Sequence, residues 1–173
     1  ASFTFQAQDD GGTANGGIDL DQTANTITID VTPVNDAPAG TDKTLTVNED
    51  ASYTFTAADF GFTDVDGNTF ASVEITTPPA AGLLTTNGVV VSAGDFVTTA
   101  DIDLNRLAFT PAANANGDGY ASFTFQVRDD GGTANGGADL DPTANTITVD
   151  VTSVNDAPSG THNTLKLGDE TIE

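Results

Sequence analysis

An internal repeat with an offset of 120 residues constrains this chain more than any other feature. When residues 1–45 are aligned with residues 121–165, they differ at nine positions and agree at 36 of 45. A period of this length is too long for one unit of a solenoid and fits one independently folded domain per repeat. The 173 residues therefore read as a window of about one and a half repeats on a tandem array.

Repeat boundaries are predicted from the motif VNDAP, which occurs at 34–38 and again at 154–158. Its proline restricts the preceding alanine to extended backbone, as suits a linker. We expect residues 1–37 to be the last two strands of a preceding repeat plus a linker. Residues 38–157 are expected to be a complete repeat, and residues 158–173 to be the start of the next repeat or a divergent tail.

Apolar and polar residues alternate in short runs throughout the predicted complete repeat, which is the pattern of half-buried strands. Such runs lie at 44–47, 53–57, 73–75, 83–91, 107–109, 123–127 and 147–151. Asn87-Gly88 within one run is typical of a tight hairpin turn, and residues 100–107 predict a single helical turn. About seven short strands separated by turns predict an all-β fold, an antiparallel immunoglobulin-like β-sandwich.

The two strands expected in residues 1–34 lack the other strands of their sandwich. An isolated hairpin is marginal in water, because it exposes an apolar face and two unpaired edges. We therefore expect this segment to become ordered only by packing on another molecule or on the central domain.

Charge and composition exclude several classes of function. Acidic residues outnumber basic ones by 26 to 4, giving a net charge of -22, and such a surface repels nucleic acids and anionic lipids. No apolar run is long enough for direct membrane insertion. With no cysteine and His162 as the one histidine, thiol, zinc and histidine-based catalysis are disfavoured. Acids in solvated loops are also poorly placed for glycoside hydrolysis, so we expect no enzyme activity.

The predicted strand order places acidic loops at both ends of the sandwich. Loops 63–69 and 128–132 are expected to meet beside the upstream VNDAP, and loops 48–52 and 114–119 beside the downstream one. Like charges held this close cost several kcal/mol unless a counter-ion offsets them, and four basic side chains are too few. Calcium fits such loops because it takes six to eight oxygen ligands and tolerates irregular geometry.

The candidate calcium ligands divide between the two ends. Those at the upstream end are Asn35, Asp36, Asp64, Asp66, Asp129 and Asp130. Those at the downstream end are Glu49, Asp50, Asp118, Asn155 and Asp156. Asp139 and Asp141 are a further candidate pair. An EF-hand is not expected at DVDGN, because Gly67 comes two positions early and Ile75 stands at the twelfth position. The alternative to calcium binding is that the acidic residues only keep the protein soluble.

Five motifs in combination resemble the bacterial cadherin-like tandem repeats of giant secreted adhesins, including those of the RTX class. They are NEDASYTF, TDVDGN, LAFTPAANANGDG, FTFQVRDDGG and TITVDVTSVNDAP. The resemblance extends over nearly the whole chain except the last nine residues. It implies an extracellular, calcium-dependent β-sandwich that spaces a stalk on the bacterial surface, in cell adhesion or biofilm formation. The implied partners are neighbouring repeats, with the target surface bound by other domains of the parent protein.

The resemblance also implies roles for individual residues. Glu49 would be the ligand from the first strand, and Asp64 with Asp66 the pair at the top of the domain. Asn35-Asp36 and Asn155-Asp156 would be the linker ligands. The alternative function is a calcium-dependent ligand- or carbohydrate-binding module. The chain has no tryptophan and only two tyrosines, which disfavours an aromatic sugar platform.

Overall fold

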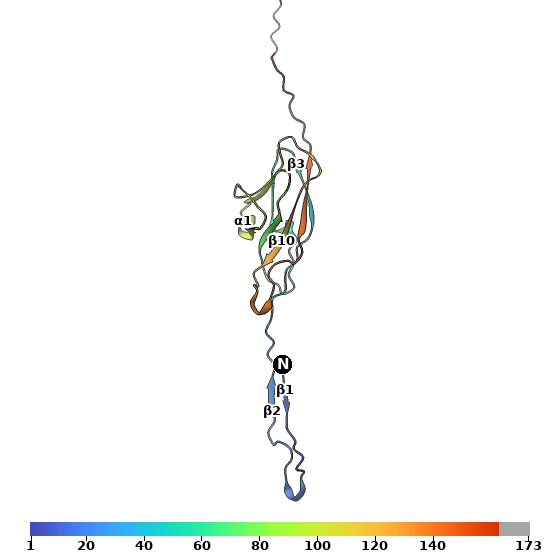
Figure 1. Cartoon of the computed structure of the whole chain (residues 1–173), viewed down its shortest axis with the longest axis vertical. Coiled ribbons are helices and arrows are strands. Elements are labelled where there is room, and N and C mark those ends of the chain that lie inside the picture. Colours follow the sequence, from blue (N-terminus) through green and yellow to red (C-terminus); the bar gives the residue numbers. More distant parts are fainter. Residues whose placement is uncertain (163–173) are drawn as a thin grey trace, which may run out of the picture. The chain divides into compact units, whose positions relative to one another are not determined.

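The computed structural model describes residues 1–162, which form two compact units that divide after Val34. The first unit, which we call the N-terminal hairpin, consists of residues 1–34. Its elements are β1 (Ser2–Phe5), the 3-10 turn η1 (Ala14–Gly16) and β2 (Asn25–Thr28), and the two strands pair in antiparallel fashion (Figure 1). The second unit, residues 35–162, is the sandwich.

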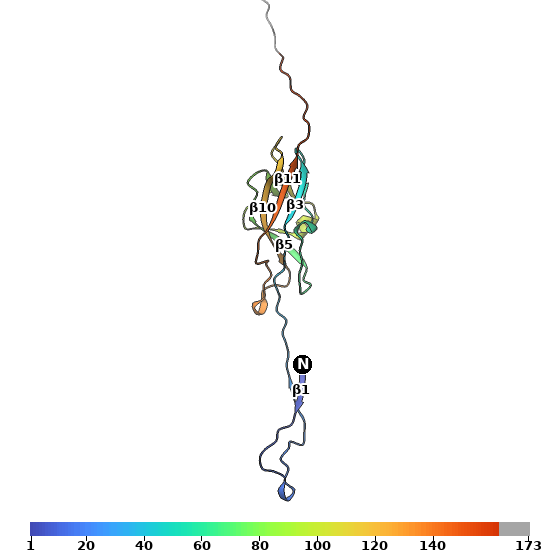
Figure 2. The same ribbon diagram turned by 90° about the vertical axis from the view of Figure 1, so that its right-hand side faces the viewer.

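The sandwich is built from two sheets whose strand order is that of an immunoglobulin-like fold. The larger sheet has the order β3 (Lys43–Asn48), β11 (Asn145–Thr152), β10 (Gly117–Asp129), β5 (Phe70–Thr77) and β8 (Asp95–Thr98) (Figure 2). The smaller sheet has the order β4 (Tyr53–Thr54), β9 (Leu107–Thr110), β6 (Leu83–Thr86) and β7 (Val89–Val90). The prediction of an all-β sandwich is thereby confirmed.

One strand pair departs from the expected antiparallel arrangement. Strands β3 and β11 are parallel, with Val149 opposite Leu45 and Val151 opposite Val47. Both strands run from the upstream end of the sandwich to the downstream end, so as neighbours they can only be parallel. Their pairing places the beginning and the end of the domain side by side in one sheet.

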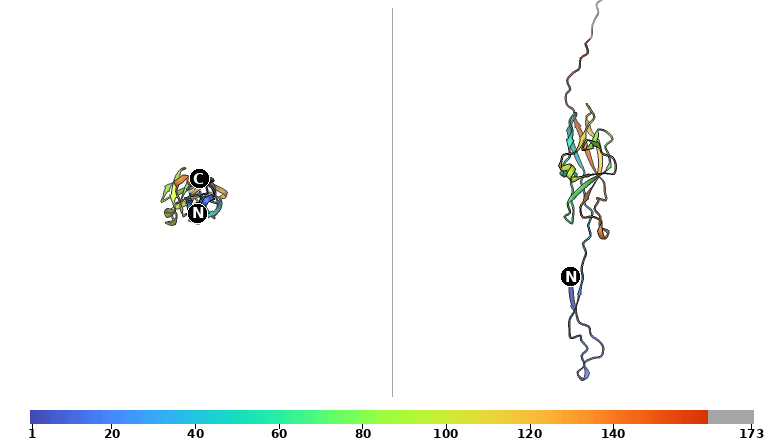
Figure 3. Two further views of the ribbon diagram at one scale, coloured as in Figure 1. Left: turned by 90° about the horizontal axis from the view of Figure 1, so that it is seen from below. Right: turned by 90° about the vertical axis from the view of Figure 1, so that its left-hand side faces the viewer.

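Short helical segments interrupt the strands. They are η2 (Ala57–Phe60), α1 (Thr99–Asp103) and η3 (Ala134–Gly136). Helix α1, a yellow-green coil in Figure 3, confirms the predicted helical turn. It is capped by Thr98, whose side chain accepts a hydrogen bond from the backbone amide of Asp101. The strand predicted over 53–57 is shorter than expected, because a capping box between Thr56 and Asp59 starts η2. Strand β8 was not predicted.

The core lies between the two sheets and is formed by the alternating residues that defined the strands. Phe123 and Phe125 of β10 meet Phe55 and Phe60 edge-on, at ring-centroid distances of 5.5 and 5.0 Å. The remaining core side chains are Leu45, Val47, Val73, Ile75, Leu84, Val91, Val97, Ile102, Leu107, Phe109, Ala121, Val127, Ile147, Val149 and Val151. Burial of this set accounts for the period-two pattern of the sequence.

The hairpin predicted around Asn87-Gly88 is confirmed as β6 and β7. Asn87 and Gly88 have φ angles of 51° and 78°, the two positive values that a tight hairpin turn of this kind requires. The predicted repeat boundaries after residues 37 and 157 remain predictions. Of the expected last segment, 158–173, residues 163–173 lie outside the described part of the chain.

The repeat supplies a matched test of the core. Phe125→Ala should lower the free energy of unfolding of the sandwich by about 3–5 kcal/mol, because the ring is fully buried against Phe60. Phe5→Ala removes the same side chain at the equivalent position of the N-terminal hairpin, where Phe5 is 42% exposed. It should leave the sandwich transition unchanged in guanidinium unfolding followed by circular dichroism. Equal losses for the two variants would contradict the division into two units.

Candidate functional site

The upstream linker is tied to the sandwich through Asn35. Its side-chain amide donates hydrogen bonds to both carboxylate oxygens of Asp129, at 3.2 and 3.3 Å, and to the backbone oxygen of Ala138, at 2.6 Å. The amide of Ala138 donates in return to the backbone oxygen of Asn35, at 3.0 Å. We call this set of contacts the Asn35 clamp. It joins the linker to the end of β10 and to the loop that follows β10.

Two glycines of that loop make room for the clamp. A β-carbon at Gly131 would overlap with the side chains of Asn35 and Asn68, and one at Gly137 would lie 3.0 Å from the Asn35 backbone nitrogen. Asn68 in turn donates a hydrogen bond to the side-chain oxygen of Asn35. Gly131 and Gly137 are therefore needed for the close approach of the linker.

Asp64 and Asp66 lie in the loop that carries Asn68. Oδ1 of Asp64 accepts a hydrogen bond from the backbone amide of Asn68, at 2.8 Å. Its other oxygen, Oδ2, is buried and has no hydrogen-bond partner within residues 1–162. Asp66 accepts a hydrogen bond from the amide of Asp36, at 2.7 Å, and this is a second tie to the linker. A buried carboxylate oxygen without a donor is costly unless a cation or water satisfies it.

Asp130 is committed to holding the two loops together. Thr69 donates to its carboxylate from both the hydroxyl, at 2.6 Å, and the backbone amide, at 2.8 Å. These two bonds lower the pKa of Asp130 below its ordinary value. Thr69 thus engages both carboxylate oxygens of Asp130.

Glu49 ties the downstream linker to the sandwich. The carboxylate accepts hydrogen bonds from the side-chain amide of Asn116, at 2.9 Å, and from the backbone amide of Val154, at 2.6 Å. These two bonds, that of Asn116 first, lower the pKa of Glu49 in the folded chain. The stability that this carboxylate contributes is therefore complete above the pKa of an unfolded glutamate and is lost as the pH falls through the lowered value.

The other downstream candidates are less closely associated. Asp50 accepts a hydrogen bond from the amide of Asn114, at 3.3 Å. Asp118, Asn155 and Asp156 are exposed, and Asn155 donates to the backbone oxygen of Asp156. The structure thus brings Glu49 and the linker together and leaves these three side chains in solvent.

The further candidate pair has structural partners. Asp139 forms an ion pair with Arg128, at 2.7 Å. Asp141 is only 2% exposed and accepts hydrogen bonds from Gly40, Thr143 and Asn145, which fix the loop before β11.

Basic side chains do not pair with the candidate ligands of either end in residues 1–162. The ion pairs within residues 1–162 are Lys43–Asp59, Arg106–Asp101 and Arg128–Asp139. The candidate ligands of both ends are absent from these pairs. The same residues contain no group of three or more acidic or histidine side chains close enough to hold a metal ion. A cation at the upstream end would therefore need amide and backbone oxygens beside the carboxylates of Asp64 and Asp129.

Sequence reasoning missed three residues that build the two ends. Asn68 and Gly131 complete the Asn35 clamp, and Asn116 holds Glu49. Asn68 and Asn116 lie within the acidic motifs TDVDGNT and NANGDG, so the presence of an amide beside the carboxylates was the available signal. The contact with Gly131 had no local signal, because it depends on two loops that meet only in the fold.

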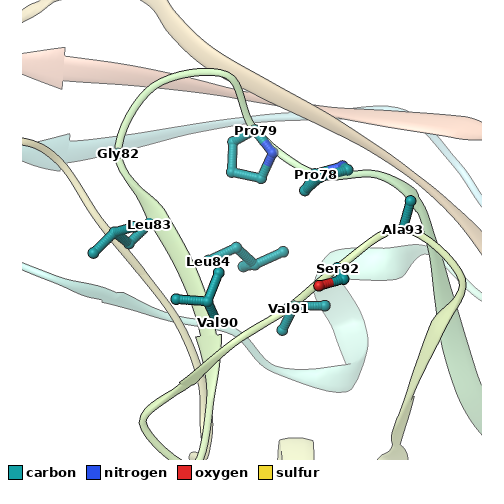
Figure 4. A pocket seen from close by; sticks show the side chains of 9 residues that line it. All are labelled: Pro78, Pro79, Gly82, Leu83, Leu84, Val90, Val91, Ser92 and Ala93. Atoms are coloured by element: carbon teal, nitrogen blue, oxygen red, sulfur yellow. The ribbon is translucent and has the colours of Figure 1, made fainter.

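A small apolar pocket lies beside β6 and β7 of the smaller sheet. It has a volume of about 290 Å³ and is lined by Pro78, Pro79, Gly82, Leu83, Leu84, Val90, Val91, Ser92 and Ala93 (Figure 4). The Ser92 hydroxyl is the one polar side-chain group of this lining. Such a lining offers little to orient a sugar, whose hydroxyls need several convergent hydrogen-bond partners.

Comparison with known proteins agrees with the fold. Residues 35–138, more than half of the chain, match the family described as bacterial Ig domain, and the chain belongs to this family. The match begins at Asn35, the residue that starts the sandwich. This family is a structural, non-catalytic domain type. No curated protein and no solved structure was found to match the chain. No helix within residues 1–162 has the length and apolar character needed to cross a membrane.

The clamp can be broken without changing any charge. Gly131→Ala should displace Asn35 and lower the free energy of unfolding of the sandwich by about 1–3 kcal/mol, because the added methyl group overlaps with two asparagine side chains. The matched control is Gly11→Ala at the equivalent position of the N-terminal hairpin, where the nearest atom is an Asp9 oxygen at 3.1 Å. Hydrogen exchange at the Ala138 amide should accelerate only in Gly131→Ala. Unchanged exchange at Ala138 would show that the clamp does not form.

Proposed function

We propose that this chain is part of a tandem array of spacer domains in a bacterial surface adhesin, and that calcium stabilises each domain at its ends. The observation that carries the proposal is that both linkers of the sandwich are bonded to its acidic ends, through Asn35 upstream and Glu49 downstream. The 120-residue repeat and membership of the bacterial Ig domain family support an array of such domains. Proteins built from bacterial Ig domains are typically found at the cell surface, which supports an extracellular location.

The mechanical role follows from how the linkers leave the domain. A linker held only by its covalent bond turns freely, whereas Asn35 and Asp36 are held by three different parts of the sandwich. Parallel pairing of β3 and β11 connects the upstream and downstream linkers through one sheet. Force applied along the array is then carried by adjacent, hydrogen-bonded strands.

A calcium ion at the upstream end would be held by Asp64 and Asp129 together with amide oxygens of Asn35 and Asn68. The buried, unpartnered oxygen of Asp64 supports this choice, since it is an available ligand. Oxygens of this kind are the ligands that calcium prefers. Rotation of the Asn35 amide by half a turn would present its oxygen instead of its nitrogen to such an ion. At the downstream end, Glu49 is the carboxylate best placed to contribute.

Binding would stabilise the folded domain by mass action, by RT ln(1 + [Ca²⁺]/Kd) for each site. At millimolar calcium and a micromolar dissociation constant this is about 4 kcal/mol. Part of the gain would come from relief of repulsion between carboxylates that lack basic partners. Removal of calcium would leave the linkers restrained by the hydrogen bonds of Asn35 and Asp36 upstream and of Glu49 downstream.

Thermal melts of the full chain in calcium, in magnesium and in chelator test the calcium part of this proposal. Calcium should raise the melting temperature of the sandwich by ten degrees or more, as a stabilisation of several kcal/mol implies, and magnesium should raise it less. Asp64→Asn should remove most of the calcium shift. In chelator the same variant should be no less stable than the parent, because a neutral amide replaces a carboxylate whose Oδ2 is buried without a hydrogen-bond partner in residues 1–162.

Asp103→Asn is the matched control, because it removes an equal charge from an exposed position in α1. It should retain the full calcium shift. Equal melting in the three solutions would rule out a stabilising calcium site and leave solubility as the role of the acids. A calcium shift of the same size in Asp64→Asn and Asp103→Asn would move the site away from Asp64.

A further inference from the structure

The N-terminal hairpin presents an apolar face that matches the most deeply buried part of the sandwich. Phe3 is 53% exposed, whereas its equivalent Phe123 is 1% exposed. Ile27 is 43% exposed, and its equivalent Ile147 is fully buried. The same contrast holds for Phe5, Ile29 and Val31 when they are compared with Phe125, Val149 and Val151. The apolar face of the hairpin therefore consists of exposed residues whose equivalents in the sandwich are buried in its core.

The hairpin also has the strand register of its buried equivalent. Phe3 pairs with Ile27 in the hairpin as Phe123 pairs with Ile147 in the sandwich. The turn before β2 is fixed in the same way, because Asp21 accepts hydrogen bonds from Thr23 and Asn25, as Asp141 does from Thr143 and Asn145. The hairpin thus shares with β10 and β11 both the strand register and the turn that joins the strands.

We infer that this face is a docking surface for the first seven strands of another copy of the repeat, equivalent to β3–β9, and not for the outer surface of the sandwich in its own chain. The neighbours of β10 and β11 define what the partner must supply. Phe123 and Phe125 pack on Phe55 and Phe60, β10 pairs with β5, and β11 pairs with β3. A segment like residues 38–116 provides all four contacts.

Few changes at the interface oppose this docking. Among the core positions, Ala7 replaces Val127, which removes two methyl groups, and Ile29 replaces Val149, which adds one. Both changes stay apolar, and their volumes partly offset each other. The free edges of β1 and β2 carry unpaired backbone groups that the added strands would satisfy. This inference rests on the repeat and does not depend on the calcium proposal.

The test extends the chain at its N-terminus with a second copy of residues 38–120. Because Tyr120 precedes Ala121, and Ala1 is the equivalent of Ala121, the junction keeps the natural sequence. Hydrogen exchange at the amides of Phe3, Phe5 and Ile27 should slow at least 100-fold relative to the 173-residue chain. The matched control carries Phe55→Ser in the added copy alone and should lose this protection. The experiment is run in chelator, so that its outcome is independent of calcium.

Four results would overturn the inference. The first is a hairpin whose amides stay unprotected on extension. The second is a hairpin whose amides are already equally protected in the 173-residue chain. The third is measured on the 173-residue chain carrying Phe3→Ser and Phe5→Ser, as a change in the melting temperature of the sandwich. This measurement tests the inference even if the extended chain folds poorly. These substitutions should leave the melting temperature of the sandwich within one degree of the parent. A fall of several degrees would show that the hairpin docks on its own sandwich. Sedimentation of the 173-residue chain as a dimer that these substitutions dissociate would assign the face to a second hairpin.

Discussion

Unbalanced negative charge at the two ends of the sandwich is the constraint on which the rest of this structure depends. The three ion pairs described do not include the candidate ligands at the ends, whose carboxylates instead accept hydrogen bonds from backbone amides, asparagine side chains and threonine hydroxyls. These donors belong largely to the linkers and to the loops that face them. The hydrogen bonds that stabilise the end carboxylates are therefore largely the same ones that fix the linkers.

The two ends satisfy this constraint differently. At the downstream end, Glu49 has a hydrogen-bond donor for each oxygen, so a cation there would compete with existing hydrogen bonds. At the upstream end, one oxygen of Asp64 is buried without a donor from the described residues 1–162, whereas both oxygens of Asp129 beside the clamp accept hydrogen bonds. An added cation should therefore stabilise the folded domain most at the upstream end. The downstream end is already held by hydrogen bonds to Glu49.

The sequence was informative where the signal is local or periodic. Alternating apolar residues located most strands, and Asn87-Gly88 located a hairpin, because backbone geometry there depends on adjacent residues. Strand β8 was missed because its apolar residues Phe96 and Val97 are adjacent and show no alternation, and it forms by pairing with β5. The Asn35 clamp was only partly predicted. The sequence indicated that the linker and two acidic loops meet, but the roles of Asn68 and Gly131 depend on side-chain packing across the fold.

A spacer that calcium stiffens makes its clearest prediction for the angle between consecutive domains. The chain has no cysteine, so spin labels can be placed at Asp103→Cys in each domain of a chain with two complete repeats. Double electron–electron resonance then reports the distribution of distances between the labels. A narrow distribution in calcium that broadens in chelator is the expected result. Distributions of the same width in both solutions would show that calcium does not hold the domains in a fixed orientation.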